Sequence, residues 1–172
     1  MKNSLRKVVL IAMMTVAPLM ASEYEFKTQS LFALEGGISD TEVQNDKVGT
    51  VGLKIGAQTE NYRIFLSVRN YMVDDVSHFN TYGAELQYIF NFSKPVNFFL
   101  GANVGQADVK LNATSGTESS TYYGADAGFN YHATEMIDLE IGARYMELQE
   151  DALLDTRVAS AYASVIIKWE MD

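Results

Sequence analysis

The chain has no cysteine and only two prolines in its 172 residues. Without cysteine the fold can form neither disulfides nor thiolate metal sites. Asp and Glu total 22 against 13 for Lys and Arg, with no basic stripe, which excludes nucleic acid as a partner. After Ser22, no apolar run approaches the roughly 20 residues that a membrane-spanning helix requires. If this chain crosses a membrane, it must therefore cross as strands.

The first residues have the pattern of a signal peptide. Three basic residues within the first seven positions precede an apolar run over residues 8–20, and the small residues Ala21 and Ser22 come next. This order of charge, apolar core and small residues is typical of a cleavable secretory signal. The sequence therefore predicts a signal peptide over 1–21 and a single exported domain over 22–172.

Alternation of apolar and polar residues dominates the remainder of the chain and is weakest over residues 28–38. In residues 136–148, the apolar Ile137, Leu139, Ile141, Ala143 and Tyr145 alternate with Asp138, Glu140, Gly142, Arg144 and Met146. A period of two is the period of a strand with two unlike faces. Comparable segments predict eight strands, over 28–38, 48–59, 62–69, 79–92, 96–107, 121–131, 136–148 and 157–169.

The predicted connections alternate in length along the chain. Short turns are expected at 60–61, 93–95 and 132–135, and longer loops at 39–47, 72–78, 108–120 and 149–156. Transmembrane barrels of the outer membrane show this asymmetry between short periplasmic turns and longer outer loops, and an even strand count allows closure. The predicted fold is all-β, an eight-stranded antiparallel up-and-down transmembrane β-barrel.

The two faces of these strands predict different surroundings. Aromatic residues of the apolar face fall at two levels, as expected for girdles at the lipid interfaces. The short-turn girdle comprises Tyr62, Phe90, Phe98, Tyr131 and Trp169, and the long-loop girdle Tyr82, Tyr123 and Tyr145. The inward face carries Glu35, Lys54, Arg63, Arg69, Glu85, Asp126, Glu140, Arg144 and Lys168. We expect a lumen network in which Lys54 and Arg69 meet Glu85, while Arg144 meets Asp126 and Glu140.

The strings YGAELQY (82–88), GADAGFNY (124–131) and IGARY (141–145) combine glycine, small residues and a terminal aromatic. In this they resemble the small outer-membrane β-barrel family that includes the OmpA transmembrane domain and OmpX. The resemblance implies the outer membrane of a Gram-negative bacterium, contact with the bilayer and its lipopolysaccharide, and insertion by the barrel assembly machinery. One departure is that Trp169 is followed by three further residues, whereas family members usually end in an aromatic.

Few residues offer catalytic or metal chemistry. Ser77 and His78 follow two acids, and His132 lies near Glu135, but the two histidines are predicted at opposite ends of the barrel. We therefore predict no catalytic residue, no cofactor and no metal site. The acidic loop residues have no calcium-loop spacing, which favours a solvated surface over a calcium site. These residues are Asp40, Glu42, Asp46, Asp74, Asp75, Glu150, Asp151 and Asp155.

Three functions are compatible with this pattern. The favoured one is a monomeric barrel with a structural or surface-interaction role through its outer loops, whose ligand the sequence does not identify. The alternative is a narrow porin-like channel for ions or small solutes. A third is a soluble periplasmic barrel that binds a lipophilic ligand, with the apolar face turned inward. A glycine-lined path through the lumen would favour the channel, and a closed charge network would favour the anchor.

Overall fold

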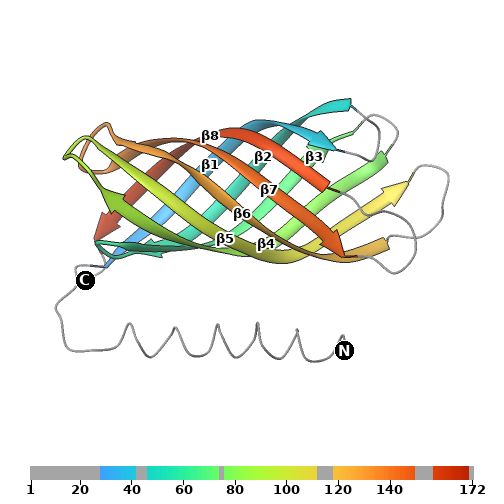
Figure 1. The fold of residues 1–172 in the computed structure, drawn as a ribbon, viewed down its shortest axis with the longest axis horizontal. Coiled ribbons are helices and arrows are strands. Elements are labelled where there is room, and N and C mark those ends of the chain that lie inside the picture. Colours follow the sequence, from blue (N-terminus) through green and yellow to red (C-terminus); the bar gives the residue numbers. More distant parts are fainter. Residues whose placement is uncertain (1–27, 42–45, 74–75, 112–117, 150–156, 171–172) are drawn as a thin grey trace, which may run out of the picture.

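The computed structural model describes residues 28–41, 46–73, 76–111, 118–149 and 157–170, which form eight antiparallel strands. The strands are β1 (Gln29–Thr41), β2 (Asp46–Gln58), β3 (Tyr62–Met72), β4 (Val76–Asn91), β5 (Val96–Leu111), β6 (Glu118–His132), β7 (Ile137–Gln149) and β8 (Arg157–Glu170). Each strand pairs with the next, and β8 pairs with β1 to close the barrel (Figure 1). The predicted fold class is confirmed. Within these ranges, no helix is long and apolar enough to cross a bilayer.

The alternation along each strand separates a polar interior from an apolar exterior. In β8, Val158, Tyr162 and Ile166 are buried inside the barrel, while Ala159 and Ile167 are exposed. The buried charged residues of the other strands, such as Glu35 and Arg69, point inward, and large aliphatic side chains cover much of the outside. This orientation contradicts the soluble-barrel interpretation, because that interpretation needs the apolar face inside and the charged face in water.

The strands extend further toward the long connections than predicted. The expected loop 39–47 contains the end of β1 and the start of β2, and the expected loop 108–120 contains the end of β5 and the start of β6. Asp108 and Ser119 are partners in the β5–β6 ladder, and the Ser119 hydroxyl donates to the Asp108 carboxylate at 2.6 Å. The apolar alternation stops where the outer surface becomes polar, whereas backbone pairing continues beyond it. Loop limits read from hydropathy were therefore wrong at this end.

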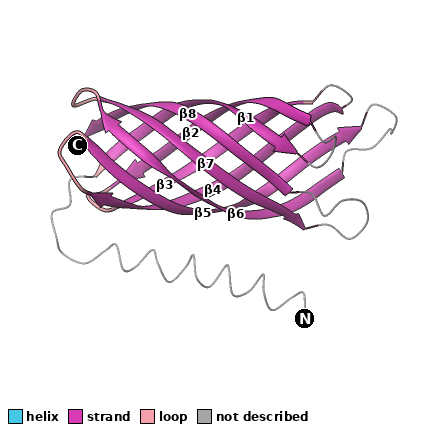
Figure 2. Cartoon of the chain, turned by 45° about the horizontal axis from the view of Figure 1, so that its top comes forward, coloured by secondary structure: helices cyan, strands magenta, loops and turns pink. Residues whose placement is uncertain are grey.

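The three short turns lie together at one end of the barrel, coloured pink in Figure 2. The Thr59 amide donates to the Tyr62 carbonyl at 2.8 Å, and the Thr134 amide donates to the Ile137 carbonyl at 3.0 Å. The Thr134 hydroxyl also accepts from the Ile137 amide at 3.0 Å. Because the strand count is even, the start of β1 and the end of β8 also reach this short-turn end.

Apolar side chains inside the barrel form two clusters on either side of the charged centre. The larger one, which we call the loop-end plug, comprises Val48, Tyr71, Val73, Phe79, Ala107, Tyr122, Met146, Leu148 and Val158. A smaller cluster of Leu31, Ala33, Phe65 and Ile166 lies toward the short turns. The lumen is thus layered, with its central ion pairs held between two apolar layers.

Inward glycines make room for aromatic rings rather than for an open path. A Cβ at Gly142 would lie 2.7 Å from Cζ of Tyr162, and one at Gly105 would lie 2.8 Å from Cε1 of Tyr122. The Tyr122 ring also covers Gly83. These positions accept no side chain, because the ring of a neighbouring strand already fills the space.

Candidate functional site in the barrel lumen

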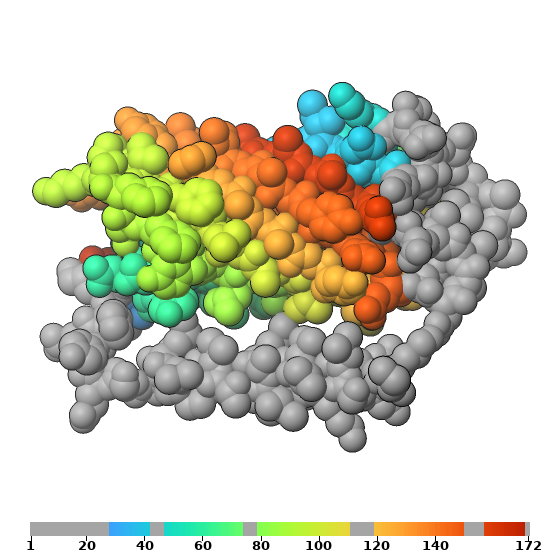
Figure 3. All heavy atoms as spheres, viewed as in Figure 1, coloured from blue at the N-terminus to red at the C-terminus, as the bar shows by residue number. Residues whose placement is uncertain are grey.

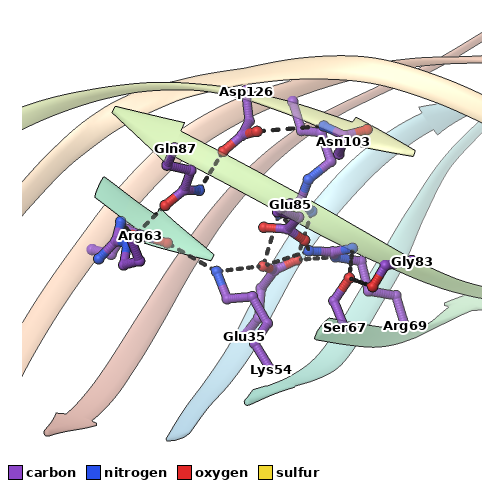
Figure 4. Close-up of polar contacts among 12 residues, drawn as sticks. Glu35, Lys54, Arg63, Ser67, Arg69, Gly83, Glu85, Gln87, Asn103 and Asp126 are labelled. Carbon is purple, nitrogen blue, oxygen red and sulfur yellow. Dashed lines mark hydrogen bonds and ion pairs between the residues drawn. The ribbon is translucent and has the colours of Figure 1, made fainter. Parts of the chain in front are cut away.

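Glu35, at the middle of β1, is the centre of the lumen charge network. Arg144 from β7 meets it with two parallel bonds, Nη1 to Oε1 at 2.8 Å and Nη2 to Oε2 at 3.0 Å. Arg69 of β3 donates from Nε to Oε1 at 2.8 Å, and Nζ of Lys54 on β2 lies 3.1 Å from Oε2. One buried carboxylate therefore joins three cations from three other strands. Two of these cations, Lys54 and Arg69, are labelled beside Glu35 in Figure 4.

Glu85 of β4 is the second acceptor at the centre. It pairs with Arg69, as the sequence predicted, and lies 3.7 Å from Nη2 of Arg144. Arg69 also donates from Nη1 to the Ser67 hydroxyl at 2.9 Å. The two central arginines thus bridge Glu35 and Glu85, and each carboxylate faces more than one cation.

Glu140 of β7 forms a second branch toward the short turns. Lys54 donates from Nζ to Oε1 at 2.9 Å, and Arg63 of β3 pairs with Oε2. Arg63 extends this branch of the network by donating from Nε to Oε1 of Gln87 at 2.7 Å. The predicted contact of Lys54 with Glu85 is replaced by contacts with Glu35 and Glu140, because Lys54 lies between these two carboxylates.

Asp126 on β6 differs from its predicted role. Its acceptor oxygens are met by neutral amides, Nε2 of Gln87 at 2.5 Å and Nδ2 of Asn103 at 3.4 Å. Arg144 is its neighbour in the β6–β7 register, yet the guanidinium reaches past β8 to Glu35 on β1. The structure therefore corrects the predicted pairs of Arg144 with Asp126 and Glu140. The predicted pairing left out Glu35, which is the partner that Arg144 meets. The central position of Glu35 on the inward face of β1 was the sequence feature that could have identified it.

Acidic and basic groups balance inside the barrel. The buried cations are Lys54, Arg63, Arg69, Arg144 and Lys168, and the buried anions are Glu35, Glu85, Asp126, Asp138 and Glu140. Five groups of each sign balance the formal charge among the residues whose burial the structure describes. A buried charge without a partner costs several kcal/mol, so this balance is what allows so many charges inside one small barrel.

A separate polar cluster lies at the short-turn end of the lumen. The fully buried Asp138 accepts from Lys168 at 2.7 Å and from Asn130 at 2.9 Å, and lies 2.8 Å from Nδ1 of His132. These groups join β6, β7 and β8. His132, which lies near Glu135 in the sequence, pairs with Asp138, which lies opposite it in the β6–β7 ladder.

The candidates for catalysis and metal binding do not assemble. His78 belongs to the start of β4 at the long-connection end, and His132 to the end of β6 at the short-turn end, as predicted. Among the described residues, no three His, Cys, Asp or Glu side chains form a group that could hold a metal ion. Asp74 and Asp75 lie outside the described residues, as do most of the acidic positions weighed for calcium.

Aromatic residues on the outer face are concentrated on one side of the short-turn end. All eight predicted girdle residues point outward, with Phe98 the least exposed. Ring centroids lie 5.2 Å apart for Tyr62 and Tyr88, 4.7 Å for Tyr88 and Phe90, and 5.7 Å for Phe90 and Phe98. Phe98 in turn contacts Phe129 at 5.5 Å. Tyr88 and Phe129 were missing from the predicted girdle, although both lie on the predicted outer face.

The protein-family model described as the outer membrane protein beta-barrel domain matches residues 9–165 of the chain. The chain belongs to this family. It is therefore an outer-membrane protein, and its apolar exterior is the face that meets lipid. The search of curated proteins finds no match.

Solved structures show the same fold at low identity. Neisserial surface protein A has 20% identity and a TM-score of 0.68, with 83% of this chain and 97% of that chain covered. The N-terminal barrel of Pseudomonas aeruginosa OprF has 17% identity and a TM-score of 0.67, covering 84% and 100%. Ail of Yersinia pestis, solved with the heparin analogue sucrose octasulfate, has 16% identity and a TM-score of 0.57, covering 83% and 99%.

Proposed function

We propose that this protein is a closed, monomeric anchor in the outer membrane, inserted by the barrel assembly machinery, whose long-loop end meets molecules outside the cell. The filled lumen is the observation that carries the proposal. Strands that are all paired and an interior tied together by ion pairs give a rigid support, and function then lies in the loops that the support holds.

The contents of the lumen support an anchor over a channel. A glycine-lined path past Lys54, Glu85 and Arg144 was the feature that would favour conduction. Those three side chains are ion-paired, and rings such as Tyr122 cover the inward glycines. An ion on this route would have to separate buried pairs and then pass the loop-end plug.

Conductance of the purified barrel in planar lipid bilayers tests the proposal. We expect the wild-type protein to leave the current at the level of the protein-free bilayer. The double variant Arg144→Ala with Glu35→Ala removes the central ion pair, and it is compared with wild type as the barrel with a disrupted network. Discrete, reproducible wild-type conductance would support the porin-like channel and overturn the anchor.

The charge of the long-loop end indicates which partners an anchor of this kind would meet. Over positions 40–47, 74–75, 108–118 and 147–157, acidic residues outnumber basic residues by eleven to three. A surface of this sign attracts cationic partners and repels dissolved polyanions such as sulfated sugars. The heparin analogue bound by Ail is a polyanion, so the loop chemistry of this chain favours the opposite class of ligand.

A titration of the reconstituted barrel distinguishes the two ligand classes. Polylysine should bind at low salt and dissociate at high salt, because exposed charges are screened. Sucrose octasulfate should not bind under either condition. Saturable binding of sucrose octasulfate would refute the cationic-partner proposal while leaving the closed lumen unaffected.

A further inference from the structure

The outer face of β6, β7 and β8 carries a row of alanines in register. Ala127 lies opposite Ala143 across the β6–β7 ladder, and Ala143 lies opposite Ala161 across β7–β8. The row continues to Ile38 on β1 and to Leu100 on β5. Three adjacent strands therefore each contribute one methyl group to the row, and the large side chains of Ile38 and Leu100 lie at its two ends.

This row forms the floor of a groove on the lipid-facing wall, which we call the alanine groove. A second row on the loop side adds Ala125, Tyr145, Ala159 and Asp40, which are also partners in register. Inward residues such as Arg144 also line the groove; their side chains lie in the lumen, so they contribute backbone. The small side chains leave the strand backbones accessible from the membrane side.

The groove is confined to one side of the barrel. At membrane depth on β2 and β3, the outward side chains are Leu53, Ile55, Leu66 and Val68, all large and exposed. The face with the groove is turned toward the viewer in Figure 3, where the later strands lie side by side in orange and red. A wall that needed only general lipid contact would be served by the bulky pattern of β2 and β3.

The groove runs obliquely down the lipid-facing wall from the long-connection end toward the short-turn end. Cross-strand rows run perpendicular to the strands, and the strands are inclined to the barrel axis (Figure 1). Ile38 is close to the long-connection end of β1, whereas Leu100 is close to the short-turn end of β5. Four steps between neighbouring strands give a length of roughly 19 Å. The groove therefore descends from the outer surface into the bilayer.

Charged residues lie at its upper end. Asp40 and Lys47 are partners in the β1–β2 register, both are exposed, and both line the groove. A lysine ammonium suits a phosphate, and a carboxylate suits the cation that accompanies a phosphate. An apolar groove with this polar end matches an amphiphile that has a phosphorylated head and a slender apolar tail.

We propose that the alanine groove binds one acyl chain of lipopolysaccharide, with a head-group phosphate at Lys47. This rests on the proposed function only in placing the long-loop end outside the cell, where the outer leaflet supplies this lipid. A second copy of the barrel fits less well, because it would present a broad convex wall to a narrow oblique groove. Such a contact would also leave Lys47 with no phosphate to meet.

Filling the groove tests the proposal. The variant Ala143→Leu with Ala161→Leu occupies the groove, and Ala57→Leu with Ala84→Leu adds the same volume on the lipid-facing side of β2 and β4. Each barrel is reconstituted with equal amounts of lipopolysaccharide and phosphatidylethanolamine, and retained lipid is measured by native mass spectrometry. The heat-dependent gel mobility of each variant establishes that it is folded.

We expect wild type and control to retain lipopolysaccharide, and the filled variant to lose retention by about tenfold, since overpacking removes the site. Lys47→Gln should lower retention with the groove intact. Equal retention by filled variant and control would overturn the proposal. Preferential retention of phosphatidylethanolamine, or a dimer that only the filled variant loses, would overturn the assigned occupant. Wild-type conductance would refute the closed anchor without changing lipid retention.

Discussion

Neutralising Glu35 should destabilise the barrel more than a change of similar size on its surface. Glu35→Gln keeps the shape of the side chain but leaves five buried cations facing four anions. Arg144 loses a carboxylate that it meets at 2.8 and 3.0 Å, and Lys54 loses one at 3.1 Å. Removing one member of a buried pair typically costs about 3–5 kcal/mol, mostly because the remaining charge is left buried.

A second substitution separates this charge effect from lost packing. Adding Lys54→Met removes one cation and restores neutrality while keeping a long apolar side chain beside Phe65, over whose ring the lysine Nζ lies at 5.0 Å. The double variant should therefore recover part of the stability that Glu35→Gln loses. A double-mutant cycle isolates this coupling between the two residues.

Guanidinium unfolding in micelles measures both effects. The single tryptophan, Trp169, lies exposed on the outer face of β8 and reports transfer from lipid to water. We expect a lower free energy of unfolding for Glu35→Gln than for Glu35→Gln with Lys54→Met. Two results would show that charge balance does not stabilise this lumen. One is a free energy of unfolding for Glu35→Gln equal to that of wild type. The other is a double variant whose loss of free energy equals the sum of the losses of Glu35→Gln and Lys54→Met.

Three further outcomes are expected. Gly142→Val should lower the free energy of unfolding by about 1–3 kcal/mol, because its side chain would overlap the Tyr162 ring. Gly36→Val is the control and should not lower it, because the space around Gly36 is open. Equal effects of the two substitutions would contradict this packing. Asp138→Asn should cost about 1–3 kcal/mol in the same assay, since it removes the charged acceptor of Lys168, and an unchanged midpoint would count against it. In electrophoresis, the unboiled protein should migrate differently from the boiled protein, and identical mobility would argue against a closed barrel.

The sequence predicted the eight strands and the direction of their faces because alternation records which side of a strand meets lipid. It could not place the strand ends at Thr41, Leu111 and Glu118. Near these ends the strands continue to pair, but their alternate positions no longer differ in hydropathy. Hydropathy marks the edge of the membrane, whereas hydrogen bonding marks the end of a strand.

The pairing inside the lumen was predicted only in part. Arg69 with Glu85 involves neighbouring strands and was expected, but Arg144 passes its register neighbour Asp126 and reaches Glu35. Long side chains in a narrow lumen meet partners across it, so the tilt and closure of the barrel decide the pairs. That geometry appears only once all eight strands are placed.

The ion pairs that cross the lumen also bear on how the barrel is built. Glu35 and Arg144 are 109 residues apart, and Lys54 and Glu140 are 86 apart. No single hairpin contains both members of either pair, so a hairpin entering the bilayer alone would carry bare charges into hydrocarbon. Insertion should therefore be concerted, with most strands associated before any of them is fully immersed, and slow because its decisive contacts are distant in sequence.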